Sequence, residues 1–180
     1  MKQDLKFVEE LVAKYGVKFE FENGNLGENS SEEQARNARY NFLRKIAKRE
    51  NAIIFTAHHK NDLAETFALN LARGGSWRAV ACFDSPDIER PFLRFSKSEI
   101  LKMAKQRGLV WREDSTNFSH KYTRNRIRKT LNFSEKDLES IFEIWQRQIE
   151  LRREIEKITQ EILFEIGDGQ KFEREFFRTN

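Results

Sequence analysis

The sequence predicts an α/β fold in which a parallel sheet carries flanking helices and is followed by a helical segment. Two observations predict it. Short apolar runs of strand type alternate with segments of helical period through residues 1–132, the pattern expected of helices packed on a parallel sheet. Residues 133–180 instead space most of their apolar side chains at a helical period. We therefore expect an α/β domain at 1–132 and a helical extension at 133–180.

The first predicted helix lies at residues 4–16, DLKFVEELVAKYG. Its apolar side chains recur at helical period, and it ends at Gly16, a natural C-terminal cap. Residues 17–21, VKFEF, then alternate apolar and charged side chains. Alternation of this kind is typical of a strand with one buried face, so we expect a strand there.

A capping motif predicts where the second helix begins. Ser30 or Ser31, with Glu33 or Gln34 three residues further on, forms the capping box that opens a helix from 32 to about 49. The turn-rich loop NGNLGENSS precedes this motif, and it lacks the lysine and the glycine spacing of a phosphate-binding loop. The simpler interpretation of this stretch, an ordinary loop and helix cap, is the one we favour.

The apolar run AIIFTA, residues 52–57, has the β-branched composition of a buried parallel strand. A helix over about 61–72 should follow it, with Leu63, Phe67 and Leu71 on one face. Gly74 and Gly75 come after this helix rather than between a strand and a helix. They are therefore expected to cap it and not to cradle a phosphate.

Beyond this point the strand pattern weakens. Residues 84–93, DSPDIERPFL, hold both prolines and predict a loop, and residues 96–108 predict a helix. Residues 134 to about 166 predict one long helix whose apolar seam, interrupted by Gln148, needs a partner: the body of this chain, a second copy, or an absent segment. The seam comprises Ile144, Leu151, Ile155, Ile158 and Ile162.

Charge is distributed unevenly along the chain, although the net charge of +4 is only mildly basic. One cluster is the acid-free run of Lys121, Arg124, Arg126, Arg128 and Lys129, and the other is Arg36, Arg39, Arg44, Lys45, Lys48 and Arg49. Tyr40, Phe118 and Tyr122 lie among these cations. Solvated helix faces would explain most such runs, but aromatic side chains beside cations are also how single-stranded RNA is held.

Cysteine content and hydropathy favour a cytoplasmic protein with no membrane segment. Cys82 is the only cysteine and has no partner for an intrachain disulfide. The sequence has neither an N-terminal apolar run nor a long hydrophobic stretch. A reducing cytosol is the expected environment.

The densest group of chemically useful side chains is His58, His59, Asp62 and Glu65. Adjacent histidines at the end of a strand point in different directions, so a zinc site is poorly supported and no metal ligand is assigned. Asp62 and Glu65 are three residues apart and share a helix face near the carboxyl end of the predicted strand, where open α/β sheets bind ligands. This placement favours a small-molecule site with acid, base or magnesium roles, although structural caps would look similar.

Three segments together resemble the tRNA(Ile)-lysidine synthase family, a branch of the N-type ATP pyrophosphatases. The first is EQARNARYNFL at 33–43. The second, TAHHKNDLAETFALNLARGGS at 56–76, is similar to the pattern A-H-H-x-x-D-x-x-E-T-x-x-x-x-x-x-R-G. The third, at 90–128, resembles R-P-L-L, a helix ending in G-L, then E-D-x-S/T-N and R-N-x-x-R. The resemblance implies an adenine nucleotide alpha-hydrolase-like fold, with the helical extension acting as a linker or a tRNA-binding part.

The resemblance also implies an enzyme, an ATP-dependent ligase. Such enzymes adenylate the wobble cytidine of a minor isoleucine tRNA and release pyrophosphate, after which the side-chain amine of L-lysine displaces AMP to give lysidine. The implied cofactors are ATP and Mg²⁺, and the implied partners are tRNA(Ile) with a cytidine wobble base and L-lysine. Charge develops at phosphate and the amine must lose a proton, so cations and a carboxylate or histidine are needed nearby.

Site residues follow from the matched positions. His58 and His59 correspond to the paired histidines beside the nucleotide, and one is expected to contact the α-phosphate. Asp62 and Glu65 are expected to hold the lysine ammonium, position magnesium or take the proton. Seven further residues are expected to contact phosphate or RNA, the last five by closing over the site: Arg36, Arg39, Asp114, Asn117, Arg124, Asn125 and Arg128.

One departure from the family is large: the nucleotide loop S-G-G-x-D-S is absent from the sequence. We therefore expect an N-terminally incomplete domain, whose exposed sheet edges need a homo-oligomer or a partner that carries the missing segment. A non-catalytic tRNA-binding remnant is the main alternative. A tRNA base thiolase is a weaker one, because such enzymes typically use cysteine pairs and this chain has only Cys82.

Overall fold

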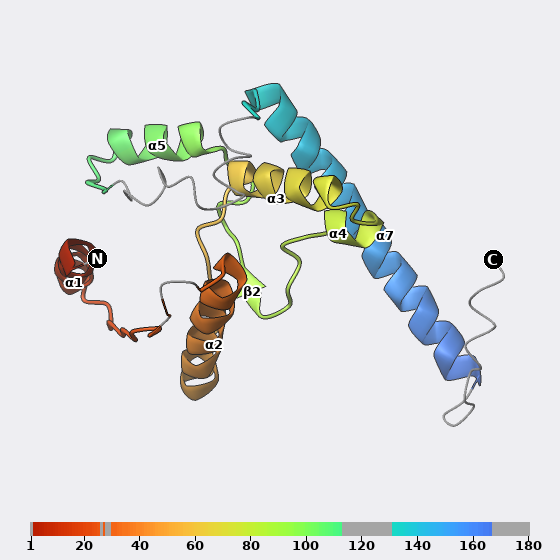
Figure 1. The fold of residues 1–180 in the computed structure, drawn as a ribbon, viewed down its shortest axis with the longest axis horizontal. Coiled ribbons are helices and arrows are strands. Elements are labelled where there is room, and N and C mark those ends of the chain that lie inside the picture. The colour runs from red at the N-terminus through yellow and green to blue at the C-terminus, as the bar shows by residue number, and fades with distance from the viewer. Residues whose placement is uncertain (1, 26, 28–29, 113–130, 167–180) are drawn as a thin grey trace. The chain divides into compact units, whose positions relative to one another are not determined.

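A computed structural model describes residues 2–25, 27, 30–112 and 131–166 (Figure 1). The elements in chain order are α1 (Lys2–Tyr15), α2 (Glu32–Glu50), β1 (Ile54–Phe55), α3 (Lys60–Ala72), α4 (Trp77–Val80), β2 (Ile88–Glu89), α5 (Lys97–Gln106) and α7 (Glu135–Ile166). The chain divides into two compact units, one from residues 1–60 and 85–132 and the other from 61–84 and 133–180.

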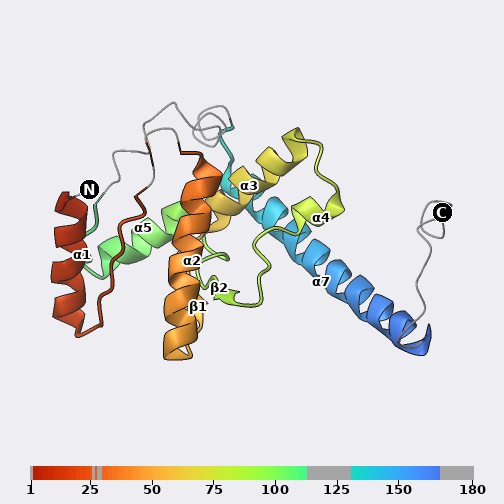
Figure 2. The same cartoon turned by 60° about the horizontal axis from the view of Figure 1, so that its bottom comes forward.

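The first unit contains a parallel pair of strands beside α2 (Figure 2). β1 and β2 pair in the register Ile54 to Ile88 and Phe55 to Glu89. Ile54 and Ile88 pack with Tyr40 in a small core, to which Leu43 and Ala47 of α2 add partly buried side chains. Phe55, on the opposite face of the sheet, is 66% exposed. The unit therefore has one covered and one open sheet face.

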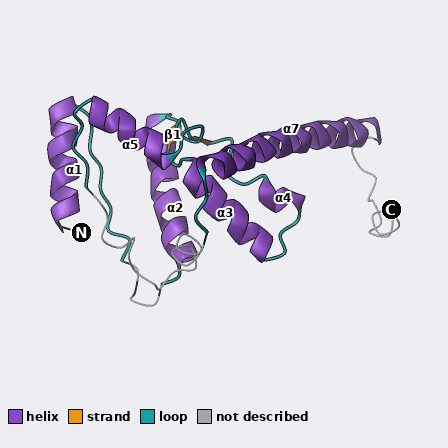
Figure 3. Ribbon diagram, turned by 90° about the horizontal axis from the view of Figure 1, so that it is seen from above, coloured by secondary structure: helices purple, strands orange, loops and turns teal. Residues whose placement is uncertain are grey.

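The parallel α/β arrangement is confirmed on a smaller scale than the sequence predicted. Figure 3 shows a mostly helical chain, and the sheet within the described residues has two strands of two residues each. The strand predicted at 52–57 is present only as β1. The loop predicted at 84–93 is wrong in part, because it contains β2, which is flanked rather than interrupted by Pro86 and Pro91. A two-residue strand is too short to give a periodic signal.

The strand predicted at 17–21 is wrong. These residues run as irregular chain, and no strand among the described residues pairs with them. Their charged side chains instead reach the C-terminal end of α2: Lys18 Nζ lies 2.8 Å from Glu50 Oε1, and Arg49 pairs with Glu20. Alternation marks a sequence that suits a strand, but a strand forms only where a neighbour completes its hydrogen bonds.

The capping box is confirmed, with Ser31 as the N-cap of α2. The Ser31 hydroxyl accepts from the Gln34 N–H at 3.1 Å, and the Ser31 N–H donates to Gln34 Oε1 at 2.8 Å. Each bond satisfies a backbone N–H group at the start of the helix that would otherwise have no intrahelical partner. Helix α2 ends at Glu50 and is capped by Asn51, whose φ of 49° is left-handed, a conformation that asparagine tolerates.

The helices predicted at 4–16, 61–72 and 96–108 are confirmed as α1, α3 and α5. The predicted apolar face of α3 is wrong at one position: Leu63 is fully buried, but Leu71 is 50% exposed and Leu69 is buried instead. The glycine pair caps α3, as predicted. Gly74 has a φ of 71°, and the Gly75 N–H donates to the Asn70 carbonyl at 2.8 Å.

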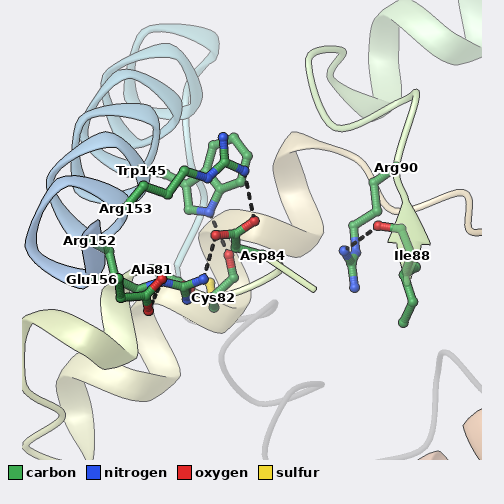
Figure 4. A network of polar contacts seen from close by, with 9 residues as sticks. All are labelled: Ala81, Cys82, Asp84, Ile88, Arg90, Trp145, Arg152, Arg153 and Glu156. Carbon is green, nitrogen blue, oxygen red and sulfur yellow. Dashed lines mark hydrogen bonds and ion pairs between the residues drawn. The ribbon is translucent and has the colours of Figure 1, made fainter. Parts of the chain in front are cut away.

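The second unit is built from α3, α4 and α7. The long helix is confirmed. The described residues bury Leu138 and Ile149, whereas the seam predicted at 144–162 is mostly uncovered: Leu151 is half-buried, and Ile144, Ile155, Ile158 and Ile162 are exposed. A second copy or an absent segment therefore stays the predicted partner of the seam. Polar contacts at the 81–84 turn explain the difference (Figure 4). Trp145 Nε1 donates to the Cys82 carbonyl at 2.5 Å, and Arg152 and Arg153 donate to the Asp84 carboxylate at 2.5 and 3.0 Å. These bonds orient α7, and hydrophobic period alone does not reveal them.

Candidate functional site

The carboxyl end of β1 is held in place on both sides of the histidine pair. The Thr56 N–H donates to the Glu89 carbonyl at 3.0 Å, which extends the strand pairing by one residue. The Lys60 N–H donates to the Phe95 carbonyl at 2.9 Å. His58 and His59 lie between these two anchors and are both half-buried. The backbone of 56–60 is therefore fixed against two other segments of the same unit.

His58 is oriented by the residue two positions before it. Thr56 Oγ1 lies 2.8 Å from His58 Nδ1. When the threonine hydroxyl donates, Nδ1 is the acceptor and the neutral imidazole carries its proton on Nε2. That tautomer presents an N–H donor, the form suited to contact a phosphate oxygen. Sequence analysis missed Thr56, although its position two residues from a strand-end histidine is the signal that identifies it.

Lys60 is a second residue that sequence analysis missed. Its side chain is only 8% exposed although it begins α3, and buried lysines are rare. Its charge is felt at Glu99, whose pKa is lowered first by the hydrogen bond from the Ser96 backbone and also by the Ser96 hydroxyl and the Lys60 charge. The Ser96 N–H donates to Glu99 Oε2 at 2.7 Å, which caps α5. A lysine directly after two site histidines was the available signal.

The two predicted carboxylates lie on α3. Asp62 is half-buried in the first turn, and Glu65, one turn further on, is 5% exposed. The positive end of the helix dipole favours an acid in the first turn, which explains Asp62 structurally. Glu65 lies beyond the first turn and is buried, which is rare for a carboxylate. Glu65 is therefore the stronger candidate for chemistry.

Arg36 and Arg39 lie on α2 around a buried tyrosine. Their guanidinium carbons are 5.3 and 5.5 Å from the Tyr40 ring centroid, and that of Arg44 is 5.8 Å away. Arg44 also donates to Asp87 at 2.6 Å and lowers the pKa of that carboxyl. The ring thus supports three cations of one helix, and Arg44 ties the helix to the residue before β2.

The predicted residues fall into three groups. His58 and His59 belong to the first unit with Arg36 and Arg39, and Asp62 and Glu65 belong to the second. No three His, Cys, Asp or Glu side chains within the described ranges are grouped to hold a metal ion. The remaining predicted residues lie outside the described residues: Asp114, Asn117, Arg124, Asn125 and Arg128. The basic run at 121–129, Phe118 and Tyr122 lie outside them too.

Comparison with known proteins places the chain in a family. The sequence model of the PP-loop domain matches residues 1–135. The chain belongs to the PP-loop domain family. This membership implies the adenine nucleotide alpha-hydrolase fold, of which β1, β2 and their neighbouring helices are the described part.

Relatives of this PP-loop chain carry one name, tRNA(Ile)-lysidine synthase. The chain is 41% identical to that of Thermotoga sp. strain RQ2 over 137 residues, which cover 71% of the chain and 33% of the relative. It is 36% identical to that of Mesoplasma florum over 179 residues, 93% of the chain and 43% of the relative. It is 35% identical to that of Bacillus subtilis over 136 residues, 71% of the chain and 29% of the relative.

These matches confirm the family resemblance seen in the three motifs. The PP-loop chain spans between 29% and 43% of the length of these three relatives. The Mesoplasma florum match extends through nearly the whole chain, and so includes the region of α7. None of the described helices has the length and apolar character required to cross a bilayer.

Proposed function

We propose that this chain is part of a tRNA(Ile)-lysidine synthase, an ATP-dependent ligase that acts in the cytoplasm. The observation that carries the proposal is the similarity to lysidine synthases at 35–41% identity, which includes one relative matched over 93% of the chain. The substrates we propose are ATP, L-lysine and a tRNA(Ile) whose wobble base is cytidine. Membership of the PP-loop domain family supports the nucleotide.

The proposed reaction has two steps. The C2 oxygen of the cytosine attacks the α-phosphorus of ATP, a phosphorus–oxygen bond forms, and the bond to the β-phosphate breaks to release pyrophosphate. The ε-amine of lysine then attacks C2, the carbon–oxygen bond to the adenylyl group breaks, and AMP leaves. The amine nitrogen loses a proton in this step. Negative charge therefore develops on phosphate oxygens in the first step, and a base is useful in the second.

His58 is proposed to contact the α-phosphate. Its support is the 2.8 Å contact between Thr56 Oγ1 and Nδ1, which allows Nε2 to act as a donor. The anchors on Thr56 and Lys60 limit movement of the segment that carries it, and preorganised donors stabilise developing charge better than mobile ones. His59 is proposed as the second donor of the pair.

Glu65 is proposed to bind the lysine ammonium or to take its proton, with Asp62 as its neighbour on the same helix face. Burial of Glu65 supports this role, because a buried carboxylate attracts an ammonium group more strongly than an exposed one does. Arg36 and Arg39 are proposed to contact RNA or phosphate. Asp114, Asn117, Arg124, Asn125 and Arg128 stay predicted tRNA contacts on the strength of the sequence match.

The two implied cofactors differ in how well the described residues suit them. The hydrogen-bond donors at the end of β1 and the cations of α2 suit ATP, although the motif S-G-G-x-D-S is absent from the sequence. For Mg²⁺, the described residues form no group of three or more metal-ligating side chains, although Mg²⁺ that binds together with substrate phosphates needs only one or two carboxylates. Bound Mg²⁺ would neutralise phosphate charge, but no role is assigned to it at any described residue.

A tRNA-binding protein without catalytic activity is the second candidate. The observation that favours it is the group of cations on α2, where the guanidinium carbons of Arg36 and Arg39 lie 5.3 and 5.5 Å from the Tyr40 ring centroid. Under this alternative, Arg36, Arg39 and the basic run at 121–129 hold tRNA and no covalent step occurs. If catalysis needs the nucleotide loop, we propose either a homo-oligomer or a partner that supplies this loop.

The deciding experiment measures incorporation of radiolabelled lysine into a minor isoleucine tRNA transcript. The purified chain is incubated with Mg²⁺, with and without ATP, and a transcript with uridine at the wobble position serves as the matched control. We expect ATP-dependent incorporation into the cytidine transcript only. No incorporation by a folded chain that still binds the transcript would overturn catalysis by this chain and favour the tRNA-binding alternative.

A further inference from the structure

A cavity separate from the candidate catalytic residues lies in the first unit, between α2 and the segment at residues 22–24. Its volume is about 410 Å³. The α2 side of the cavity is formed by Ala35, Ala38, Arg39, Asn41, Phe42 and Lys45. None of the residues at the carboxyl end of β1 lines it. A cavity of this size is within the range that accommodates small organic ligands.

The cavity uses a face of α2 different from the one that packs on the sheet. Ala35, Ala38, Phe42 and Lys45 recur at intervals of three and four, which places them along one side of the helix. The core contacts come instead from Tyr40, Leu43 and Ala47. The cavity-lining residues are therefore not needed to bury the sheet, and their chemistry has to be explained in another way.

Among the described residues, no acidic side chain forms an ion pair with the cations at the cavity. Arg44 pairs with Asp87, and Arg49 pairs with Glu20 and Glu50. Lys45, in contrast, has no ion-pair partner in the part of the chain that the structure describes, and Arg39 contacts only the Tyr40 ring there. Two exposed cations are thus available to an anion at one cavity. Paired cations lie elsewhere on the same helix.

The remaining lining is apolar and aromatic. Phe42 is partly buried and contributes a ring, while Ala35 and Ala38 are small enough to let a flat group approach the helix closely. An aromatic ring beside unpaired cations suits a ligand that combines a flat base with a phosphate. Asn41 adds an amide, and Glu22, on the opposite side, adds a carboxylate that can accept from an exocyclic amine of a base.

We propose that this cavity binds one nucleotide unit, with its phosphate at Arg39 and Lys45 and its base against Phe42. Glu22 makes a base with an exocyclic amine, such as cytosine or adenine, a better ligand than uracil. The unit belongs either to a single-stranded segment of RNA or to a free nucleotide. The proposal deepens the proposed function where the source is tRNA, but the binding it describes requires neither adenylation by ATP nor transfer of lysine.

The test is isothermal titration calorimetry on the full chain in the absence of ATP and lysine. The probes are cytidine 5′-monophosphate, uridine 5′-monophosphate, inorganic phosphate and a five-nucleotide single-stranded RNA. We expect Lys45→Gln and Phe42→Leu each to weaken cytidine monophosphate binding about fivefold or more, as loss of a phosphate contact or of base stacking does. Lys102→Gln, at an exposed lysine of α5, is the matched control and should leave the affinity unchanged.

The outcomes separate the sources and the failures. Tighter binding of the RNA than of either mononucleotide, with the same dependence on Phe42, identifies RNA as the source, and the reverse order identifies a free nucleotide. Binding of phosphate as tightly as cytidine monophosphate, or equal losses in Lys45→Gln and Lys102→Gln, would overturn the proposal. Amide shifts at Asn41 and Lys45 during titration of the unmodified chain provide a readout that does not depend on the variants' folding. Lack of lysine incorporation affects none of these results.

Discussion

The hydroxyl of Thr56 distinguishes the environment of His58 from that of an ordinary surface histidine. It lies 2.8 Å from Nδ1 and so selects which nitrogen faces a ligand. In a complete, active synthase we expect Thr56→Val to lower turnover about fivefold, which corresponds to the loss of one hydrogen bond. Affinity for tRNA should not change, because Thr56 is proposed to act on His58 alone.

The conservative variant Thr56→Ser retains the hydroxyl and is the control for positioning. It should restore turnover and the pH profile of the unmodified enzyme, because the profile reports the protonation of groups that act in catalysis. If Thr56→Ser and Thr56→Val were equally impaired, the lost methyl packing and not the hydrogen bond would be responsible.

Glu65 is the carboxylate for which burial argues most strongly. In a complete enzyme we expect Glu65→Gln to reduce turnover at least tenfold, as removal of a general base or of an ammonium partner does. Binding of tRNA should be nearly intact. Steady-state kinetics with lysine as the varied substrate separate the two roles, since loss of an ammonium partner raises KM for lysine. Full activity in Glu65→Gln would remove Glu65 from the site.

At the scale of secondary structure, the helices other than the short α4 were predictable, but of the two strands only β1 was. Helix α2 has a local signal, Ser31 with Gln34, and that signal specifies its first turn. β2 has no such signal, because Ile88 becomes a strand residue only by pairing with Ile54. Similarly, VKFEF at 17–21 has the pattern of a strand but remains irregular. Local chemistry determines capping, whereas strand pairing depends on residues far away in the sequence.

The same distinction applies to the site residues. His58, His59, Asp62 and Glu65 were identifiable because they lie close together in the sequence. The support of Arg36 and Arg39 by the Tyr40 ring follows from helical spacing. The hydrogen bond from the Lys60 N–H to the Phe95 carbonyl joins residues 35 positions apart, and a single sequence gives no signal for it. The predicted division at residue 132 stays a prediction.

The tie between α2 and the residue preceding β2 can be tested through a titration. Arg44 donates to Asp87 and lowers the pKa of that carboxyl below its ordinary value of 3.8. The stabilisation that results is present above pH 3.8 and is lost as the pH falls through the lowered pKa. We expect Arg44→Gln to raise the pKa of Asp87 in a carbon-detected NMR titration. The difference in unfolding free energy between the two proteins should shrink below pH 3.8; a constant difference would refute this assignment.

Asp84 determines which face of α7 packs in the second unit. It accepts hydrogen bonds from Arg152 and Arg153, and its side chain is 16% exposed. We expect Asp84→Ala to lower the unfolding free energy by about 1–2 kcal/mol in urea titrations, since partly buried bonds between charged groups are lost. Glu156→Gln is the control, because Glu156 pairs with Arg152 from an exposed position, where such pairs contribute little. Equal effects in both variants would mean that general charge, and not the Asp84 contact, holds the helix.

For the whole molecule, affinity for tRNA should depend on the cations that the family resemblance implies are tRNA contacts. Arg124 and Arg128 belong to an acid-free run and correspond to the R-N-x-x-R positions of the family motif. Each phosphate contact releases condensed counterions, so the logarithm of the binding constant falls with the logarithm of the salt concentration in proportion to the number of contacts. We expect Arg124→Ala and Arg128→Ala each to weaken tRNA binding and to reduce that slope by about one.

Filter binding between 50 and 200 mM salt measures the slope, a range over which such contacts change affinity strongly. Lys102→Ala, at an exposed lysine of α5, is the control and should leave the slope as it is. If the slope stayed unchanged in Arg124→Ala and Arg128→Ala as well, these arginines would belong to a solvated surface, and tRNA would have to be held by other cations, with those of α2 the next to test.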